Sequence, residues 1–105
     1  MNYLLEKVTA FQPLEGLRAR IAFADGFSGE LDFMPLLSRG PIFAPLRDTE
    51  FFRRVVVSRH GVPEWSDDLD LSPGTLRVWC EAGRVLGQEE TDAWVETHSG
   101  AAAKV

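Results

Sequence analysis

The chain has 105 residues, of which 45% are hydrophobic, and its 16 acidic and 11 basic side chains give a formal net charge of −5. This length is typical of a single domain, and the apolar content is that of a globular protein. The negative charge opposes approach to a phosphate backbone, so the composition argues against nucleic acid as a partner. Cys80 is the only cysteine, which excludes an intramolecular disulfide and a multi-cysteine metal site.

The N-terminus has neither the basic start nor the apolar run of a signal peptide, and no segment approaches the roughly 20 apolar residues of a membrane span. Together with the single cysteine, these features predict a cytoplasmic protein with no membrane partner.

The first predicted structure is a β-hairpin. Apolar side chains alternate with other residues over 17–23 and again over 27–33, and Asp25-Gly26 lies between the two runs. This dipeptide predicts a two-residue type I′ turn, in which both residues have positive φ. We therefore expect Asp25 and Gly26 to specify the turn, and Gly26 to resist substitution.

Charged residues support this strand pairing. Arg18 and Arg20 should lie opposite Glu30 and Asp32 on the solvent face, where each pair of unlike charges contributes a few tenths of a kcal/mol. The turn-rich segment 13–16 links a further strand upstream to the hairpin. The sequence thus predicts a three-strand meander.

Short helical segments are predicted next. A helical turn starts at Met34 and ends before Gly40-Pro41, and an apolar connector covers residues 42–46. Asp48 is then placed to cap a short helix of about two turns.

A second hairpin follows this helix. Residues 55–57 are β-branched, residues 59–61 form a turn, and residues 62–65 form the returning strand. Proline lacks the N–H that a central strand must donate, so Pro63 predicts an edge position for that strand.

The C-terminal part contains one clear helix signal. Ser72 and Pro73 are typical of an N-cap and a first helical residue, so a helix is predicted over 73–82, with Gly83 after its end. Residues 84–105 are interpreted as a tail that is partly helical near 89–96 or disordered, with a mobile terminus. The expected fold of residues 1–83 is α+β, with a small antiparallel sheet. Its elements in chain order are the three-strand meander, the short helix, the second hairpin and the C-terminal helix.

One acidic cluster could in principle bind a hard cation. Asp67, Asp68 and Asp70 offer closely spaced carboxylates, the ligands that Ca²⁺ and Mg²⁺ prefer. However, Leu69 interrupts the cluster, which also lacks the glycine and the distant glutamate of a calcium loop. A solvated turn is the favoured interpretation, and no cofactor is expected.

No catalytic dyad is indicated by the remaining reactive residues. His60 lies in a predicted turn and His98 in the tail, and neither has a partner at ligand spacing or an obvious nucleophile nearby. Cys80 falls within a helix, where packing as a small hydrophobe is favoured over a reactive thiolate. The serine in residues 26–29, GFSG, lacks the strand-to-helix setting of a nucleophile elbow. The sequence identifies no active site and favours a protein that is not an enzyme.

Several sequence blocks stand in a characteristic order. They are IAFADG at 21–26, GELDF at 29–33, FAPLRD at 43–48, FF at 51–52, VVV at 55–57, and Trp65 followed by LDLSP at 69–73. This order resembles the family of small bacterial proteins known as domain of unknown function 2442, over about residues 3–80. Relatives usually have a segment similar to Pro-Asn-Gly after the tryptophan, where this chain has Ser66-Asp67-Asp68.

The resemblance implies the α+β fold already predicted. Some relatives carry a helix-turn-helix domain after this one, which would make them DNA-binding regulators, but the segment after Ala82 is not basic. Members are also often encoded beside another short protein, an arrangement similar to toxin–antitoxin pairs. The resemblance therefore implies a small protein partner.

Three functional hypotheses follow. The first is a protein-interaction module that binds itself or a small protein, through a sheet edge or through a surface formed by Trp65, Asp67, Asp68, Asp70, Arg53 and Arg54. The second is a DNA-associated regulator that uses the arginines of residues 53–59. The third is an enzyme or ligand binder whose site matches no known motif, with the aspartate cluster as its candidate.

Overall fold

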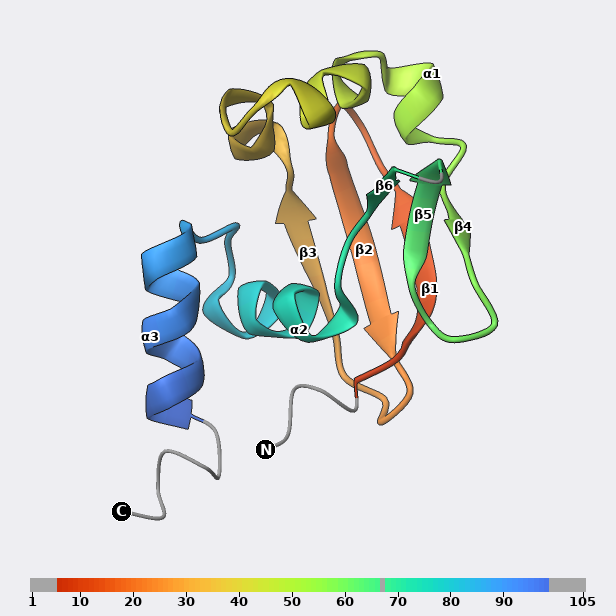
Figure 1. The fold of residues 1–105 in the computed structure, drawn as a ribbon. Helices are drawn as coiled ribbons and strands as arrows, with labels where there is room; N and C mark the ends of the chain where they lie inside the picture. The colour runs from red at the N-terminus through yellow and green to blue at the C-terminus, as the bar shows by residue number, and fades with distance from the viewer. Residues whose placement is uncertain (1–5, 67, 99–105) are drawn as a thin grey trace.

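The computed structural model describes residues 6–66 and 68–98. Figure 1 shows the predicted α+β fold, with two small antiparallel sheets and several helices. The elements are β1 (Val8–Pro13), β2 (Arg18–Phe23), β3 (Ser28–Asp32), the 3₁₀ helices η2 (Met34–Ser38) and η3 (Pro41–Arg47), α1 (Thr49–Phe52), β4 (Val56–Val57), β5 (Pro63–Ser66), β6 (Leu69–Asp70), α2 (Pro73–Ala82) and α3 (Gln88–His98).

The first sheet is the predicted meander, with the strand order β1-β2-β3. In β2, Ala19, Ile21 and Phe23 are buried, while Arg18 and Arg20 are exposed. This alternation confirms the half-buried strand, because successive side chains of a strand point to opposite faces of the sheet. One face of the sheet is therefore apolar and the other faces solvent.

The turn between β2 and β3 differs from the predicted type I′ turn. Phe23 and Phe27 close a three-residue loop, in which the Phe23 N–H donates to the Phe27 oxygen at 2.9 Å. Gly26 has a φ of 95°, but no residue other than glycine has positive φ in the described chain. Asp25 instead accepts the Phe27 N–H with its side chain at 3.1 Å. The prediction of positive φ at Asp25 was wrong, because a three-residue loop requires it at the last residue alone.

The second sheet has the order β4-β5-β6, so β5 is its central strand. The predicted edge position of Pro63 is wrong for this reason. Pro63 is tolerated because it is the first residue of β5, where a missing N–H is least disruptive, and its carbonyl still accepts the Leu71 N–H at 3.1 Å. Leu69 and Asp70, which were expected in a turn, form the third strand.

The helices match most of their predicted limits. α2 spans residues 73–82, Ser72 accepts the Thr75 N–H with its side chain, and Gly83 adopts a left-handed φ of 84°. Asp48 caps α1 as predicted, but α1 has only four residues instead of two turns. The predicted apolar connector, residues 42–46, lies within the 3₁₀ helix η3.

The hydrophobic core covers the apolar face of the first sheet, where buried side chains of η2, η3, α1, β6 and α2 pack together. α2 crosses this face beside β3 (Figure 1). A glycine in β3 permits this approach: a Cβ on Gly29 would lie 3.2 Å from the Cβ of Cys80. The side chains buried most completely are Phe33, Phe52, Ile21, Leu36, Leu46, Leu76, Val78 and Pro63.

Residues 84–98 also pack on the fold. Val85 and Leu86 are buried, and the Trp79 indole N–H of α2 donates to Thr91 of α3 at 2.9 Å. Arg39 donates to the Leu86 carbonyl. The expected mobile terminus, residues 99–105, falls outside the described residues. Within the described ranges, no helix has the length and apolar character needed to cross a membrane.

Candidate functional site

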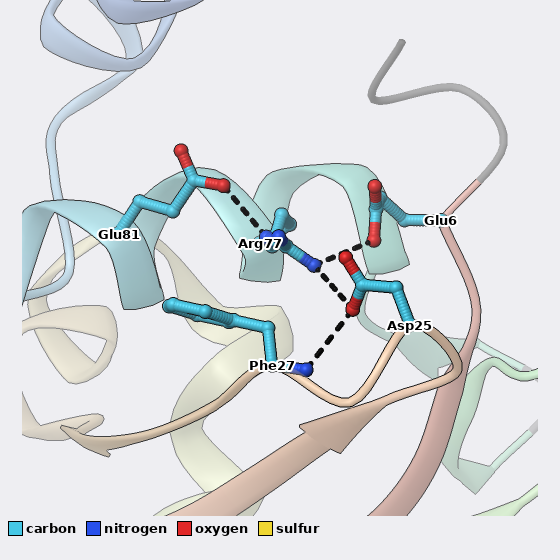
Figure 2. A network of polar contacts seen from close by, with 5 residues as sticks. All are labelled: Glu6, Asp25, Phe27, Arg77 and Glu81. Carbon is cyan, nitrogen blue, oxygen red and sulfur yellow. Dashed lines mark hydrogen bonds and ion pairs between the residues drawn. The ribbon is translucent and has the colours of Figure 1, made fainter. Parts of the chain in front are cut away.

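A buried arginine forms the most highly connected polar centre of the described structure. Arg77 lies in α2 and is only 4% exposed. Its Nη1 donates to Glu6 Oε1 at 3.1 Å and to Asp25 Oδ1 at 2.9 Å, and its Nε donates to Glu81 Oε2 at 2.6 Å (Figure 2). Arg77 thus connects the residue that leads into β1, the tip of the β2–β3 hairpin, and the next turn of its own helix.

Two aromatic rings complete the surroundings of this guanidinium. Its central carbon lies 4.2 Å from the centroid of the Phe27 ring and 5.3 Å from that of Phe23. A cation at these distances is attracted by the negative face of an aromatic ring. The hairpin therefore contacts Arg77 through both a carboxylate and aromatic rings.

The electrostatics of this centre are those of a permanent ion pair. Arg77 and then the Phe27 N–H donate hydrogen bonds to Asp25, and they hold the pKa of Asp25 below its ordinary value. Burial by itself would lower the pKa of Arg77, but hydrogen bonds to Asp25 and Glu81 outweigh it, so the pKa is raised. Neither group is poised to exchange a proton near neutral pH, which makes the centre a structural anchor.

Arg77 was not among the residues predicted from the sequence. Its only local signal is a charged residue inside the apolar stretch 76–80, with Glu81 four positions later on the same helix face. Glu6 and Asp25 are 71 and 52 residues away in the chain, so no periodicity could have placed them.

Trp65, from the predicted interaction surface, belongs to a cluster of aromatic rings. Its indole N–H donates to the Phe52 carbonyl at 2.8 Å. Its ring lies edge-on to Phe11 at 5.4 Å and is stacked on Phe52 at 5.9 Å. Trp65 is half-buried, and these contacts use both its ring and its polar atom.

The aspartates of that predicted surface are exposed where the structure describes them. Asp68 and Asp70 are both exposed, Asp70 as part of β6, while Asp67 lies outside the described residues. No group of three His, Cys, Asp or Glu side chains that could hold a metal ion occurs within residues 6–66 and 68–98.

The two arginines of that predicted surface differ in their contacts. Arg53 Nη1 donates to the Leu14 carbonyl at 3.0 Å, and Arg54 is exposed beside it. Arg53 also lines a shallow, open hollow of about 400 Å³. The other residues that line it are Pro13, Leu14, Glu15, Arg18 and Glu30.

The remaining candidates from the sequence are Cys80, His60 and His98. Burial raises the pKa of the Cys80 thiol to about 12, so the thiol stays protonated and unreactive near neutral pH. His60 is exposed in the predicted turn, where its N–H donates to the Ser58 hydroxyl at 3.2 Å. His98 is the last residue of α3.

The solvent face of the first sheet carries a charged row. Arg18 lies opposite Asp32, and Arg20 lies opposite Glu30, as predicted. Both arginines contact Glu30, at 2.7 and 3.3 Å, whereas Asp32 accepts the Met34 N–H at 3.0 Å. The expected cross-strand attraction is therefore centred on one carboxylate.

A comparison with protein families identifies the chain. The family model described as "Protein of unknown function (DUF2442)" matches residues 8–82, from the start of β1 to the end of α2. The chain belongs to the DUF2442 family. In this DUF2442 member, Arg77, Asp25 and Glu81 fall inside the matched region, while Glu6 and α3 lie outside it.

One solved structure is similar over most of this DUF2442 chain. It is a crystal structure from Nitrosomonas europaea ATCC 19718, named a "Putative DNA Binding Protein", with 28% sequence identity and a TM-score of 0.56. The match covers 95% of this chain and 56% of the other, so this chain spans about half the length of the solved protein. No curated protein matches the chain.

Proposed function

We propose that this DUF2442 protein is a non-enzymatic interaction domain that binds another small protein. The observation that carries the proposal is the first sheet, which has one face packed against the core and α2 while its other face and its β3 side are exposed. An exposed strand and sheet face offer backbone and side-chain groups to a second chain.

The proposal is supported by the contacts of the side chains that could otherwise react or bind a ligand. Arg77 is occupied by three carboxylates, the Cys80 thiol is buried and protonated, and the Trp65 indole is bonded to a backbone carbonyl. These groups stabilise the fold, which leaves the exposed surface as the part available for function.

The direct test is co-expression with the product of the adjacent gene, followed by native mass spectrometry of the purified sample. We expect a complex of defined stoichiometry that survives gel filtration. The proposal would be contradicted if the protein stayed monomeric at micromolar concentrations, both alone and when co-expressed with the product of the adjacent gene.

A second candidate function is DNA-associated regulation. The name of the similar Nitrosomonas europaea protein favours it, as do exposed arginines on the solvent face and near α1, namely Arg18, Arg20, Arg53 and Arg54. The net charge of −5 and the carboxylate of Glu30 between two of these arginines oppose it.

The two candidates differ in their dependence on salt. Phosphate contacts release counterions, so DNA binding should weaken steeply as salt increases. A mobility shift at low salt on the DNA upstream of its own gene, lost in an Arg53→Gln, Arg54→Gln variant, would favour regulation. Absence of any shift at low salt would remove this candidate.

A further inference from the structure

The hydrogen-bond pattern of the first sheet determines which backbone groups of β3 face outward. The Phe23 N–H donates to the Phe27 oxygen, and the Phe33 N–H donates to the Leu17 oxygen. Because bonded and non-bonded pairs alternate along an antiparallel ladder, residues 29 and 31 also face β2. The groups that point away from β2 are the N–H and C=O of Ser28, Glu30 and Asp32.

These outward groups are available for pairing. All three residues are exposed, and no hydrogen bond from elsewhere in the described chain reaches their backbone atoms. Figure 1 shows β3 as the outer strand on the side of β2 away from β1. The opposite edge is less open, because Pro13 of β1 lacks an N–H and the Val8 N–H donates to Gly61 at 3.0 Å.

The charges on β3 select the kind of strand that fits. Glu30 and Asp32 are exposed carboxylates on the edge strand, about 5 Å from the side chains of any strand paired with it. Glu30 contacts Arg18 and Arg20 of β2, one strand further inside the sheet, and Asp32 lies opposite Arg18. An antiparallel second copy centred on Glu30 would place this carboxylate opposite its own counterpart, which is destabilising.

We propose that β3 binds an extended segment of a partner protein, with basic side chains at alternate positions, as a fourth strand of the first sheet. Backbone bonds to residues 28–32 supply affinity, and lysine or arginine opposite Glu30 and Asp32 supplies selectivity. This inference rests on the proposed interaction function and names its surface and partner chemistry.

The test uses amide hydrogen exchange followed by NMR on the full chain. The probe is a capped eight-residue peptide in which lysine and valine alternate, and the control replaces each lysine by glutamate. We expect the lysine peptide to slow exchange at the Ser28, Glu30 and Asp32 amides. No protection by either peptide, or equal protection by both, would overturn the proposal.

Self-association is a separate outcome of the same experiment. Protection of these amides that grows with protein concentration without peptide, together with a doubled mass, would show that a second copy occupies the edge. The proposed basic partner would then be wrong.

A proline substitution probes the edge without removing the ladder to β2. Ser28→Pro deletes an outward N–H, and Ser28→Ala is the matched control because the serine hydroxyl is replaced while the N–H stays. We expect the dissociation constant of the lysine peptide to rise about tenfold in Ser28→Pro, as for one lost hydrogen bond, and to stay unchanged in Ser28→Ala. Equal affinities of both variants, with native circular dichroism, would overturn the proposal.

A charge variant gives an independent measurement if the proline variant does not fold. Glu30→Gln with Asp32→Asn keeps side-chain oxygens for Arg18 and for the Met34 N–H. It should weaken the lysine peptide about threefold to tenfold, and unchanged affinity would refute the proposed selectivity. If the co-expressed partner binds the chain but Ser28→Pro leaves that affinity unchanged, the interaction function stands and the β3 site is wrong.

Discussion

At the residue scale, the structure depends on how one buried charge is neutralised. Arg77 is the only cation contacting three carboxylates among the described residues, and two of them, Glu6 and Glu81, are 13% and 19% exposed. Removing one member of a buried ion-pair network leaves the others without compensation, which costs more than the pair itself contributes.

We predict that Arg77→Met lowers the free energy of unfolding by about 3 kcal/mol, because it removes the guanidinium contacts of the partly buried Glu6 and Glu81 carboxylates. Urea unfolding followed by tryptophan fluorescence measures this change. Arg84→Met is the matched control, since the Arg84–Glu90 pair at 3.2 Å is exposed on both sides and should contribute little. Similar losses of stability in the two variants would contradict the role of Arg77 as a structural anchor.

A second residue-scale prediction concerns pH. The pKa of Asp25 is lower in the folded chain than in the unfolded chain, so its charge stabilises the fold above the ordinary pKa of about 4. That contribution is lost as the pH falls through the lower folded value. We expect stability to decline less steeply with acid in Asp25→Asn than in the parent, as measured by thermal unfolding between about pH 6 and pH 2.

Asparagine is a suitable replacement because its side-chain oxygen can still accept the Phe27 N–H. Parallel acid profiles for the two proteins would show that Asp25 does not contribute through its charge.

At the scale of elements, the two sheets are joined through a glycine in the second hairpin. Gly61 has a φ of 80°, and its carbonyl accepts the Val8 N–H at 3.0 Å. A Cβ at this position would lie 2.7 Å from the Cβ of Lys7 and 3.0 Å from the nitrogen of Val8. By contrast, a Cβ on Gly26, which has a φ of 95°, would have no other atom within 4 Å.

This difference gives a matched pair of substitutions. Gly26→Ala should destabilise the fold by about 1 kcal/mol, the cost of left-handed backbone for a residue with a Cβ. Gly61→Ala adds a clash with backbone atoms and should cost about 2 kcal/mol more. Chemical denaturation of both variants measures the difference, and equal losses would show that the contact with β1 is not tight.

Gly26→Val extends the same test to the hairpin. A branched side chain at positive φ should unfold the protein or shift the strand register, so that any loss of activity is indirect. A Gly26→Val variant as stable as the parent would show that this turn does not specify the sheet.

At the scale of the whole molecule, α3 extends the fold beyond the residues matched by the family. Thr91 is 8% exposed, accepts the Trp79 N–H at 2.9 Å and donates to Gly87 at 2.8 Å. Thr97 is exposed, and its hydroxyl donates to the Ala93 carbonyl of the same helix at 2.8 Å.

We predict that Thr91→Val lowers stability by about 1–3 kcal/mol, because it leaves a buried indole N–H without its acceptor. Thr97→Val, which removes a hydroxyl from the exposed side of the same helix, should stay within about 0.5 kcal/mol of the parent. If the two variants were equally stable in thermal unfolding, residues 84–98 would contribute little to the domain.

Predictions from the sequence succeeded where neighbouring residues decide the structure. The strand pattern of residues 17–23 and the capping residues Ser72 and Gly83 correctly located β2 and α2. The position of Pro63 was wrong because its strand gains a second partner from β6, which follows a turn that the sequence could not resolve. The predicted turn type at Asp25 was wrong because Phe23 and Phe27 close a three-residue loop, in which the Asp25 side chain bonds to Phe27 and Arg77.

The sequence by itself determined that this chain is a small α+β protein, since composition, alternation and capping act over a few residues. Its ordered sequence blocks carried the resemblance to the DUF2442 family. Only the tertiary structure decided which partners Arg77 has, how closely Gly61 approaches β1, and that β3 has outward groups available for a further strand. Each of these depends on residues far apart in the chain that meet when the two sheets and α2 pack together. The physical reason is that burial and pairing are properties of the assembled core, which local propensity does not encode.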